Sequence, residues 1–282
     1  MTHSDSTVPD STATPDGINR RTALLSIAGV LAVAGCATDT QTARSSGPTS
    51  STASTPSKSA TASPTTTAGG PAAMPSIART AGDDIVHGPR TRQEVALTFH
   101  GAGDAALARR ILALMAAHRA KITVFAVGQW LAGAPHMAAE ILAGGHELGN
   151  HTWSHQQMKT LSSSAAALEV SKGAEELRKA VGTTGWWFRP SGTLHSTETI
   201  RAAAEQSGYK RCVSYDVDPE DFKDPGAQLV RSRTLAAVKP GSIVSLHFGH
   251  PGTLEALPGI LDGLTSAGLA PVTLSRLLRD GA

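Results

Sequence analysis

From about residue 80 onward, short β-rich runs alternate with longer helical stretches, and this alternation restricts the fold of the 282-residue chain more than any other feature. The β-rich runs are apolar or β-branched and are bounded by Gly, Pro or polar residues, as is typical of buried parallel strands. They cover residues 94–99, 122–127, 186–189, 211–216, 242–247 and 271–274. The helical stretches cover residues 105–120, 137–142, 165–181, 199–207, 229–238 and 254–267. The alternation predicts a single α/β domain.

Polar residues suited to chemistry gather where these predicted strands end. In chain order they are His100, Arg189, His195, Asp218, Asp221, His247 and His250. In an α/β barrel the carboxyl ends of the strands and the loops that follow them form the active site. Histidines scattered through a core or over a surface would not favour this edge, so we expect a functional site there.

Two further histidines of interest, His151 and His155, lie in the segment GHELGNHTWSH, residues 145–155. His151 and His155 are four residues apart, and one helical turn would align them so that both bind one metal ion. With 11 histidines in the chain, this spacing also arises by chance. The residues at the strand ends make the metal-binding interpretation the stronger one.

The N-terminal residues resemble an export signal with a lipid attachment site. Arg20 and Arg21 precede an apolar run at residues 23–34, which is too short to span a bilayer but suits the core of a signal peptide. The paired arginines resemble a twin-arginine signal, and the small residues before Cys36 resemble a bacterial lipoprotein cleavage site. A fortuitous apolar stretch is the alternative. We expect residues 1–36 to be a signal peptide and Cys36 to carry the lipid that anchors the protein to the outer face of the cytoplasmic membrane, with its domain in the cell-wall space.

Residues 37–80 are predicted to be a disordered linker, because 18 of the 34 residues from 37 to 70 are Ser or Thr and large apolar side chains are almost absent. Residues 81–282 then form the folded domain. The first 78 residues carry no net charge, so the excess of +2 lies in the domain. Without a basic run or stripe, nucleic acid is not expected as a partner. Apart from Cys36 the chain has only Cys212, so we expect no intramolecular disulfide.

With these residues located, the chain resembles the polysaccharide deacetylases of carbohydrate esterase family four over about residues 92–278. The resemblance implies an α/β fold, a distorted, TIM-like (β/α) barrel. It places His151 and His155 on the family's two metal-binding histidines and His247 on its general acid. It also places Asp221 on the carboxylate that tunes this acid, with Phe222 in place of the usual Trp.

The resemblance extends to the family's arginine motif, whose start matches Arg189 and Pro190, although the continuation here is shorter and lacks the usual aromatic residue. Arg189 is therefore expected to be part of the catalytic machinery. By their places in or beside the motifs, four further residues are predicted to contact the glycan. They are Trp187, Ser191, Gly192 and Leu246. Core packing is the alternative for the tryptophan.

The first motif departs from the family. Where the family usually has Thr-Phe-Asp-Asp, this chain has Thr98-Phe99-His100-Gly101, so the carboxylates of the catalytic base and of the third metal ligand are both absent. His100 can take at most one of these roles, because a metal-bound nitrogen has no lone pair left to accept a proton. We leave open whether His100 is the third ligand, the base or neither. Asp104 is the carboxylate nearest in sequence to replace a ligand, but it is equally well placed to cap the helix predicted after it.

The resemblance implies amide hydrolysis. A weakly electrophilic carbonyl must be polarised and a poor amine leaving group protonated. A bound divalent ion, zinc first and cobalt, manganese or nickel as alternatives, lowers the pKa of a bound water to about 7 and stabilises the oxyanion. Asp221 would favour the protonated form of His247 as the acid, and Arg189 would depress the pKa of His100 and keep it neutral.

Two functions follow from the sequence. The first is an exported, metal-dependent hydrolase that removes N-acetyl groups from a cell-wall or related polysaccharide. The second is a catalytically impaired relative that binds glycan or metal in the old active-site cleft. Retention of Arg189, Asp221, His247 and both metal histidines favours the first, whereas His100 and Gly101 favour the second.

Overall fold

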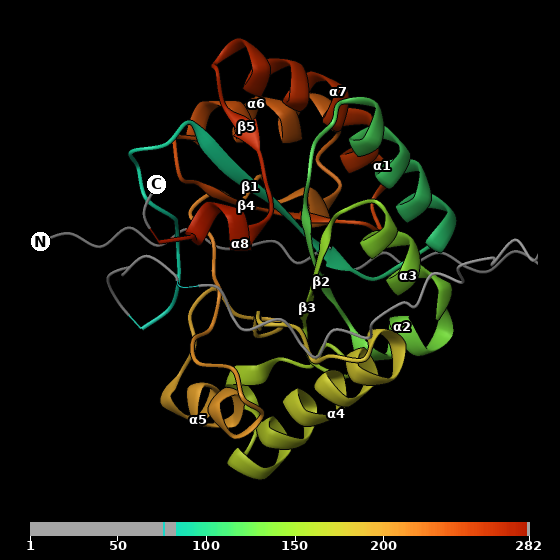
Figure 1. Ribbon diagram of the computed structural model, residues 1–282, viewed down its shortest axis with the longest axis vertical. Helices are drawn as coiled ribbons and strands as arrows, with labels where there is room; N and C mark the ends of the chain where they lie inside the picture. The colour runs from blue at the N-terminus through green and yellow to red at the C-terminus, as the bar shows by residue number, and fades with distance from the viewer. Residues whose placement is uncertain (1–75, 77–82, 281–282) are drawn as a thin grey trace, which may run out of the picture. The chain divides into compact units, whose positions relative to one another are not determined.

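The computed structural model describes Ser76 and residues 83–280 (Figure 1). The predicted signal peptide, Cys36 and nearly all of the predicted linker lie outside these residues, as do residues 281 and 282. Within the described part of the chain, no helix is both long and apolar enough to cross a membrane.

Four parallel strands form the central sheet in the order β3-β2-β1-β4. They are β1 (Glu94–Gly101), β2 (Thr123–Ala126), β3 (Glu147–Asn150) and β4 (Ile243–His247). A two-residue strand, β5 (Ala270–Pro271), pairs with the first residues of β1. Because all the strands run in parallel, their carboxyl ends meet at one end of the sheet, where the predicted site residues follow.

Irregular segments continue the sheet around the interior. Asn150 at the end of β3 pairs with Phe188, and Phe188 pairs with Cys212. Further along the same segment Val217 pairs with Val244 of β4. The result is the distorted (β/α) barrel that the sequence predicted, with regular strands on one side and single bridges on the other.

In this irregular half of the barrel, the strand predictions from the sequence were only partly correct. The predicted strands at 186–189 and 211–216 form isolated bridges only, and Pro190, which has no backbone N–H, ends the first of them. Strand β3 falls within the GHELGNHTWSH segment, residues 145–155, where no strand was predicted. Its sequence Glu-Leu-Gly-Asn lacks β-branched residues, and Gly149 is needed because a Cβ there would lie 2.9 Å from both a Phe125 ring carbon and the Trp187 carbonyl oxygen.

Within residues 83–280, eight α-helices surround the strands (Figure 1). Six agree with the predictions to within a few residues: α1 (Ala105–Ala117), α3 (His136–Ala143), α4 (Ser163–Val181), α5 (Glu198–Gln206), α6 (Ala227–Ala237) and α7 (Pro251–Ser266). Two were not predicted: α2 (Gly128–Gly133) and α8 (Leu274–Leu278), the latter beginning at the last residue of the predicted strand 271–274. Two 3-10 turns, η1 (Met158–Thr160) and η2 (Asp221–Lys223), lie near the site. Side-chain caps set several boundaries, as where Ser162 Oγ accepts a hydrogen bond from the Ala165 N–H at the start of α4.

The two faces of β1 serve different purposes. Val95, Leu97 and Phe99 belong to the main apolar core, which also contains buried residues of α1 and α7. Thr98 and His100 alternate with them and therefore point to the other face, where both contact Arg189. The two-residue period of one strand thus separates the core from the site.

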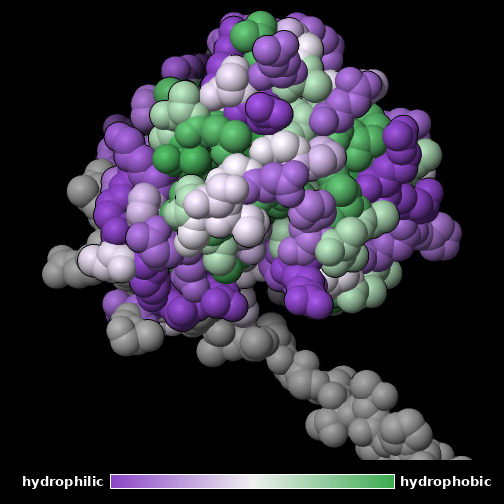
Figure 2. Space-filling view, turned by 90° about the horizontal axis from the view of Figure 1, so that it is seen from above, coloured by the Kyte–Doolittle hydropathy of each residue, from purple (hydrophilic) through white to green (hydrophobic). Residues whose placement is uncertain are grey.

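The surface in Figure 2 shows apolar side chains in separate patches among polar ones.

Stability should depend on pH through His146, which precedes β3 and is only 6% exposed. Its Nδ1 lies 3.3 Å from the Ile122 N–H and accepts from it, so the neutral ring is the form that fits. Burial, with a smaller contribution from Lys121, lowers the pKa of His146 to about 4. The unfolded chain takes up this proton below about pH 6.5, so the stabilisation is complete above that pH and is lost as the pH falls towards 4.

We predict that the free energy of unfolding, measured by urea titration of the metal-free protein, falls by up to about 3 kcal/mol through His146 between pH 6.5 and 4. His146→Asn keeps an acceptor near the position of Nδ1 but cannot titrate, so its stability should fall less steeply over this range. Equal slopes in the variant and the wild type would contradict the assignment.

Candidate active site

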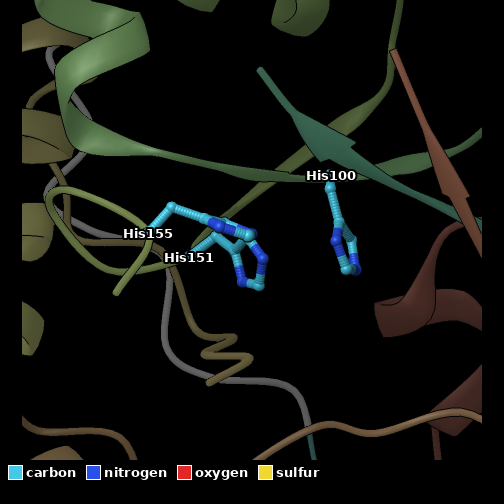
Figure 3. A group of neighbouring side chains, drawn as sticks. All are labelled: His100, His151 and His155. Carbon is cyan, nitrogen blue, oxygen red and sulfur yellow. The ribbon is translucent and has the colours of Figure 1, made fainter. Parts of the chain in front are cut away.

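Three histidines from two separate parts of the chain gather at the carboxyl end of the sheet (Figure 3). His100 is the penultimate residue of β1, His151 directly follows β3, and His155 lies in the loop beyond it. One ring nitrogen from each lies within 4.8 Å of the others. The three side chains are therefore close enough to bind one metal ion together.

The loop that carries His151 and His155 is not helical, contrary to the expectation of one helical turn. Thr152 and His155 adopt left-handed backbone conformations, with φ of 68° and 60°. Asn150 stabilises the turn because its Oδ1 accepts a hydrogen bond from the Thr152 N–H at 2.9 Å. The two rings nevertheless lie 4.9 Å apart, so a tight loop achieves what the helical turn was expected to do.

His151 presents a free nitrogen lone pair to the cluster. Its Nδ1 lies 2.8 Å from the Arg189 carbonyl oxygen, which can only accept, so Nδ1 carries the proton in the neutral ring. Its Nε2 is buried and has no hydrogen-bond partner among the described residues. A buried acceptor without a partner is costly unless something binds it, and imidazole nitrogen is a common ligand of zinc.

His100 is oriented differently, because Arg189 lies on its far side. The guanidinium Nη1 is 3.3 Å from His100 Nε2, and a guanidinium can only donate. This contact favours the tautomer in which Nδ1, which is buried and without a partner, carries the proton. The other tautomer frees the Nδ1 lone pair and directs an Nε2–H towards Ser245 Oγ at 3.4 Å. His100 can therefore act as a ligand or as a base through Nδ1 only after this change of tautomer.

All three rings favour the neutral form that metal binding requires. Burial lowers the pKa of His100 well below its ordinary value, and His151, His247 and Arg189 lower it further. Burial is also the main cause of the strongly lowered pKa of His151, and partial desolvation followed by His247 lowers that of His155. The predicted effect of Arg189 on His100 is thus confirmed in direction, although burial is the larger cause. The donor set and the unpartnered nitrogens fit a divalent ion of the zinc class.

Arg189 is a buried cation whose hydrogen bonds go to neutral groups. Its side chain, in a residue only 1% exposed, donates to the carbonyl oxygens of Val213 and Ser214 and to Thr98 Oγ1, in addition to the His100 contact. The guanidinium carbon also lies 4.2 Å from the centre of the Phe125 ring. No ion pair within residues 83–280 includes Arg189, and burial lowers its pKa to about 9. Without the first-motif carboxylates, Arg189 thus lies beneath the histidine cluster without an ion-pair partner among the described residues, and the nearby Asp218 offsets only part of the cost of its burial.

The acid half of the predicted site is intact. Asp221, in η2, is buried, and its Oδ1 accepts from His247 Nδ1 at 2.7 Å. Its Oδ2 accepts from the His247 backbone N–H at 2.8 Å and from Thr253 Oγ1 at 2.6 Å. The His247 ring lies 4.2 Å from that of His100, between centres. Thr253, which lies on α7 and holds the carboxylate in place, carried no signal in the sequence beyond its ability to form hydrogen bonds.

A cleft of about 410 Å³ opens over these groups. Besides site residues named above, it is lined by residues that sequence reasoning did not select: Gln157, Thr193, Leu194 and Tyr215. Phe222, which stands where the family has Trp, also lines it and is 44% exposed. An exposed large apolar side chain at a cleft that also contains polar groups is suited to the face of a sugar ring.

Of the four predicted glycan contacts, only Gly192 lines the cleft. Trp187 is 1% exposed in the barrel interior, where its Nε1 donates to Ser275 Oγ, so core packing was the correct alternative. Ser191 is buried, donates to the Gln156 carbonyl oxygen and accepts from Thr152 Oγ1. Leu246 is buried in the main core because its neighbours in β4 take the interior face.

Asp104 is a helix cap and does not belong to the histidine cluster. Its Oδ1 accepts a hydrogen bond from the Ala106 N–H at 2.8 Å at the start of α1. The group of side chains that could share an ion consists of the three histidines alone among the described residues. The structure therefore supports the capping alternative over the ligand.

Comparisons with known proteins agree with this geometry. A family model described as polysaccharide deacetylase matches residues 87–212. The peptidoglycan-N-acetylglucosamine deacetylase of Bacillus cereus is 30% identical over 195 residues, which cover 68% of this chain and 91% of the relative. The chain belongs to the polysaccharide deacetylase family.

Other relatives differ in what their names say. The uncharacterized protein YlxY of Bacillus subtilis is 27% identical over 172 residues, 61% of this chain, which spans about half (53%) of that relative. A pseudoenzyme of the CE4 family from Bacillus anthracis has a TM-score of 0.66 and 27% identity, covering 71% of this chain and 70% of that one. A mutant of it with restored enzymatic activity has the same TM-score and 28% identity, covering 71% and 73%.

Within this polysaccharide deacetylase, position 101 cannot readily regain the family's second carboxylate. A Cβ on Gly101 would lie 2.9 Å from Val124 Cγ1, 3.0 Å from Trp130 Cζ3 and 3.1 Å from Ala126 Cα. These atoms belong to the packed layer outside the cleft, and Trp130 is held there by a hydrogen bond from its Nε1 to the Gly103 carbonyl oxygen. This packing leaves little room for the carboxylate that a Gly101→Asp substitution would add.

We predict that Gly101→Ala lowers the free energy of unfolding by about 1–3 kcal/mol, because the added methyl group overpacks this layer. Gly133→Ala is the matched control, since nothing lies within 4 Å of a Cβ at Gly133. That variant should be as stable as the wild type or slightly more stable. Urea titrations of both variants test the packing, and a Gly101→Ala protein as stable as the wild type would show that the strand end has room.

Proposed function

We propose that this protein is a metal-dependent deacetylase that removes N-acetyl groups from a cell-wall or related polysaccharide. The observation that carries the proposal is the proximity of the three-histidine cluster to the His247–Asp221 pair, with the His100 and His247 rings 4.2 Å apart. One group suited to holding a Lewis acid thus lies beside one suited to moving a proton. The named activity of the Bacillus cereus relative supports the choice of substrate class.

His151 Nε2, one nitrogen of His155 and, in the appropriate tautomer, His100 Nδ1 would hold the ion. When bound, a divalent ion polarises the amide carbonyl and makes water more acidic. The metal histidines are neutral because of their surroundings, as described above, and the Arg189 carbonyl fixes the tautomer of His151.

His247 is the proton donor in this proposal. Asp221 accepts the hydrogen bond from Nδ1, which leaves Nε2 as the atom that exchanges protons. With the ring held in this way, His247 Nε2 can pass a proton to the leaving nitrogen as the carbon–nitrogen bond breaks. Thr253 and the His247 N–H hold Asp221 in one orientation, which keeps the ring aimed at the same point.

The base is the incomplete part of the machinery. His100 lies beside the cluster, but Arg189 favours the tautomer that places a proton on Nδ1. Proton abstraction by Nδ1 needs the tautomer whose Nε2–H faces Ser245 Oγ. Turnover is therefore expected to be slower than in a relative that carries a carboxylate at this position.

A second candidate is a non-catalytic glycan-binding or metal-binding relative. The absence of both first-motif carboxylates favours it, and so does the similarity to the CE4 family pseudoenzyme. In this alternative the histidine cluster and the cleft serve recognition, and amide bonds remain intact.

We predict that the purified protein binds one divalent ion per chain, measured by metal analysis after dialysis, and releases acetate from N-acetylated chitooligosaccharide or peptidoglycan fragments. His247→Asn should retain the metal and lose about 10²-fold to 10⁴-fold in turnover, because it removes the proton donor alone. Metal binding without acetate release from either substrate would favour the second candidate. Binding of none of zinc, cobalt, manganese and nickel, together with no acetate release, would exclude the enzyme.

His100→Ala separates the two roles left open for this residue. If His100 is a ligand, the variant should lose metal affinity substantially, as His151→Ala and His155→Ala should. If His100 is the base, metal content should be unchanged while turnover falls by about 10²-fold to 10⁴-fold. A variant with unchanged affinity and unchanged turnover would remove His100 from both roles.

We also propose that a lipid on Cys36 anchors the protein at the outer face of the membrane. Cys36→Ala should move the exported protein from the membrane fraction to the soluble fraction on cell fractionation, because a single attachment point is lost while the domain is untouched. Ser45→Ala in the linker should leave the distribution unchanged. Tight membrane association of exported Cys36→Ala protein would contradict the anchor.

A further inference from the structure

A buried carboxylate on helix α4 lies behind the loop that carries His151 and His155. Glu169 is only 5% exposed. Its Oε2 accepts from the Ser154 N–H at 2.9 Å, and its Oε1 accepts from Ser154 Oγ at 2.6 Å and from Gln156 Nε2 at 3.0 Å. All three bonds come from the two residues that flank His155. The carboxylate thus binds this loop on both sides of a candidate ligand.

The loop needs such support because its backbone is strained. Thr152 and His155 are not glycines, yet both have positive φ, and each such residue costs on the order of 1 kcal/mol or more. His155 is also the most exposed of the three clustered histidines, so core packing does little to fix its ring. Contacts from outside the loop must hold this conformation.

Helix α4 provides these contacts within little more than one turn. Asn150 Nδ2 donates to the Val170 carbonyl oxygen at 2.9 Å. Gly173 permits the close approach, because a Cβ there would lie 2.3 Å from Asn150 Oδ1 and 2.9 Å from the Thr152 carbonyl. The helix therefore contacts the start of the loop through Val170 and Gly173 and its end through Glu169.

We propose that Glu169 is a positioning residue for the metal site, acting through Ser154 and Gln156 to hold His155 in its ligating orientation. The inference rests on the proposed metal site and adds to it a determinant of affinity outside the ligands. Residues that orient metal ligands typically change affinity by about 10-fold to 100-fold when they are replaced.

Zinc affinity, measured by competition with a chromophoric chelator, tests this role without reference to activity. Glu169→Ala should weaken binding by about 10-fold to 100-fold, and Glu169→Gln, which keeps one carbonyl acceptor, should regain part of the loss. Glu175→Ala is the control for charge, because Glu175 is exposed on the same helix and pairs with Lys179. It should bind zinc as the wild type does.

Glu147→Ala controls for a general loss of stability. Glu147 begins β3, at the opposite end of that strand from His151, and accepts hydrogen bonds from Thr123 Oγ1 and the Ser275 N–H. Its removal should lower the free energy of unfolding and leave the zinc affinity of the folded protein unchanged. A purely structural Glu169 would behave in the same way.

The outcomes separate the inference from the proposed function. Wild-type protein that binds no zinc would overturn both the metal site and the role of Glu169. Wild-type protein that binds zinc, with Glu169→Ala within about two-fold of it, would overturn this inference alone. Should Glu169→Ala fail to fold, Ser154→Ala, which removes one of the three hydrogen bonds, decides the matter, with a several-fold loss of affinity expected and an unchanged affinity contradicting the role.

Discussion

The buried guanidinium of Arg189 is the interaction on which the geometry of the site depends. Its side chain ties the interior face of β1, through Thr98 and His100, to the irregular segment that closes the barrel, through the Val213 and Ser214 carbonyls. Its own carbonyl fixes His151. His100 and His151 are thus both held by one residue whose guanidinium is almost fully buried.

The surroundings of this cation are also where the site differs from the usual pattern of the family, because the first-motif carboxylates are absent. A buried charge without a counterion is unfavourable, and lowering of the Arg189 pKa to about 9 reflects this cost. The faces of Phe125 and Tyr215, several carbonyl dipoles and the charge of the nearby Asp218 partly replace the absent carboxylate. The guanidinium adds to the effect of burial in keeping the His100 ring neutral, but by donating towards Nε2 it favours the tautomer least useful for ligation. The contact between Arg189 and His100 therefore favours the neutral ring that metal binding needs, but disfavours the tautomer of that ring that could bind the metal through Nδ1.

The sequence predicted the regular half of the barrel and most of the site. Strands β1 and β4 and six of the helices show clear sequence patterns, so their existence could be predicted. The polar residues at the carboxyl ends of the strands could then be recognised as a candidate site. Strand β3 could not be predicted, because its four residues show no strand pattern. The segments 186–189 and 211–216 were predicted as strands, but they form only single bridges, whose extent depends on their neighbours in space. The conformation of the His151–His155 loop is likewise imposed by α4, a contact that no local pattern encodes. Trp187 and Asp104 each had two roles compatible with their sequence, and only three-dimensional packing decides between them.

The central claim is that the histidine cluster holds a metal ion without any first-motif carboxylate. Anomalous diffraction at the zinc absorption edge, from crystals of the protein grown with zinc, tests it most directly. We predict a single strong anomalous peak at the cluster, bound by His151 Nε2 and one nitrogen of His155, and its distance from His100 Nδ1 decides whether His100 is a third ligand. No zinc peak at the cluster would contradict this account.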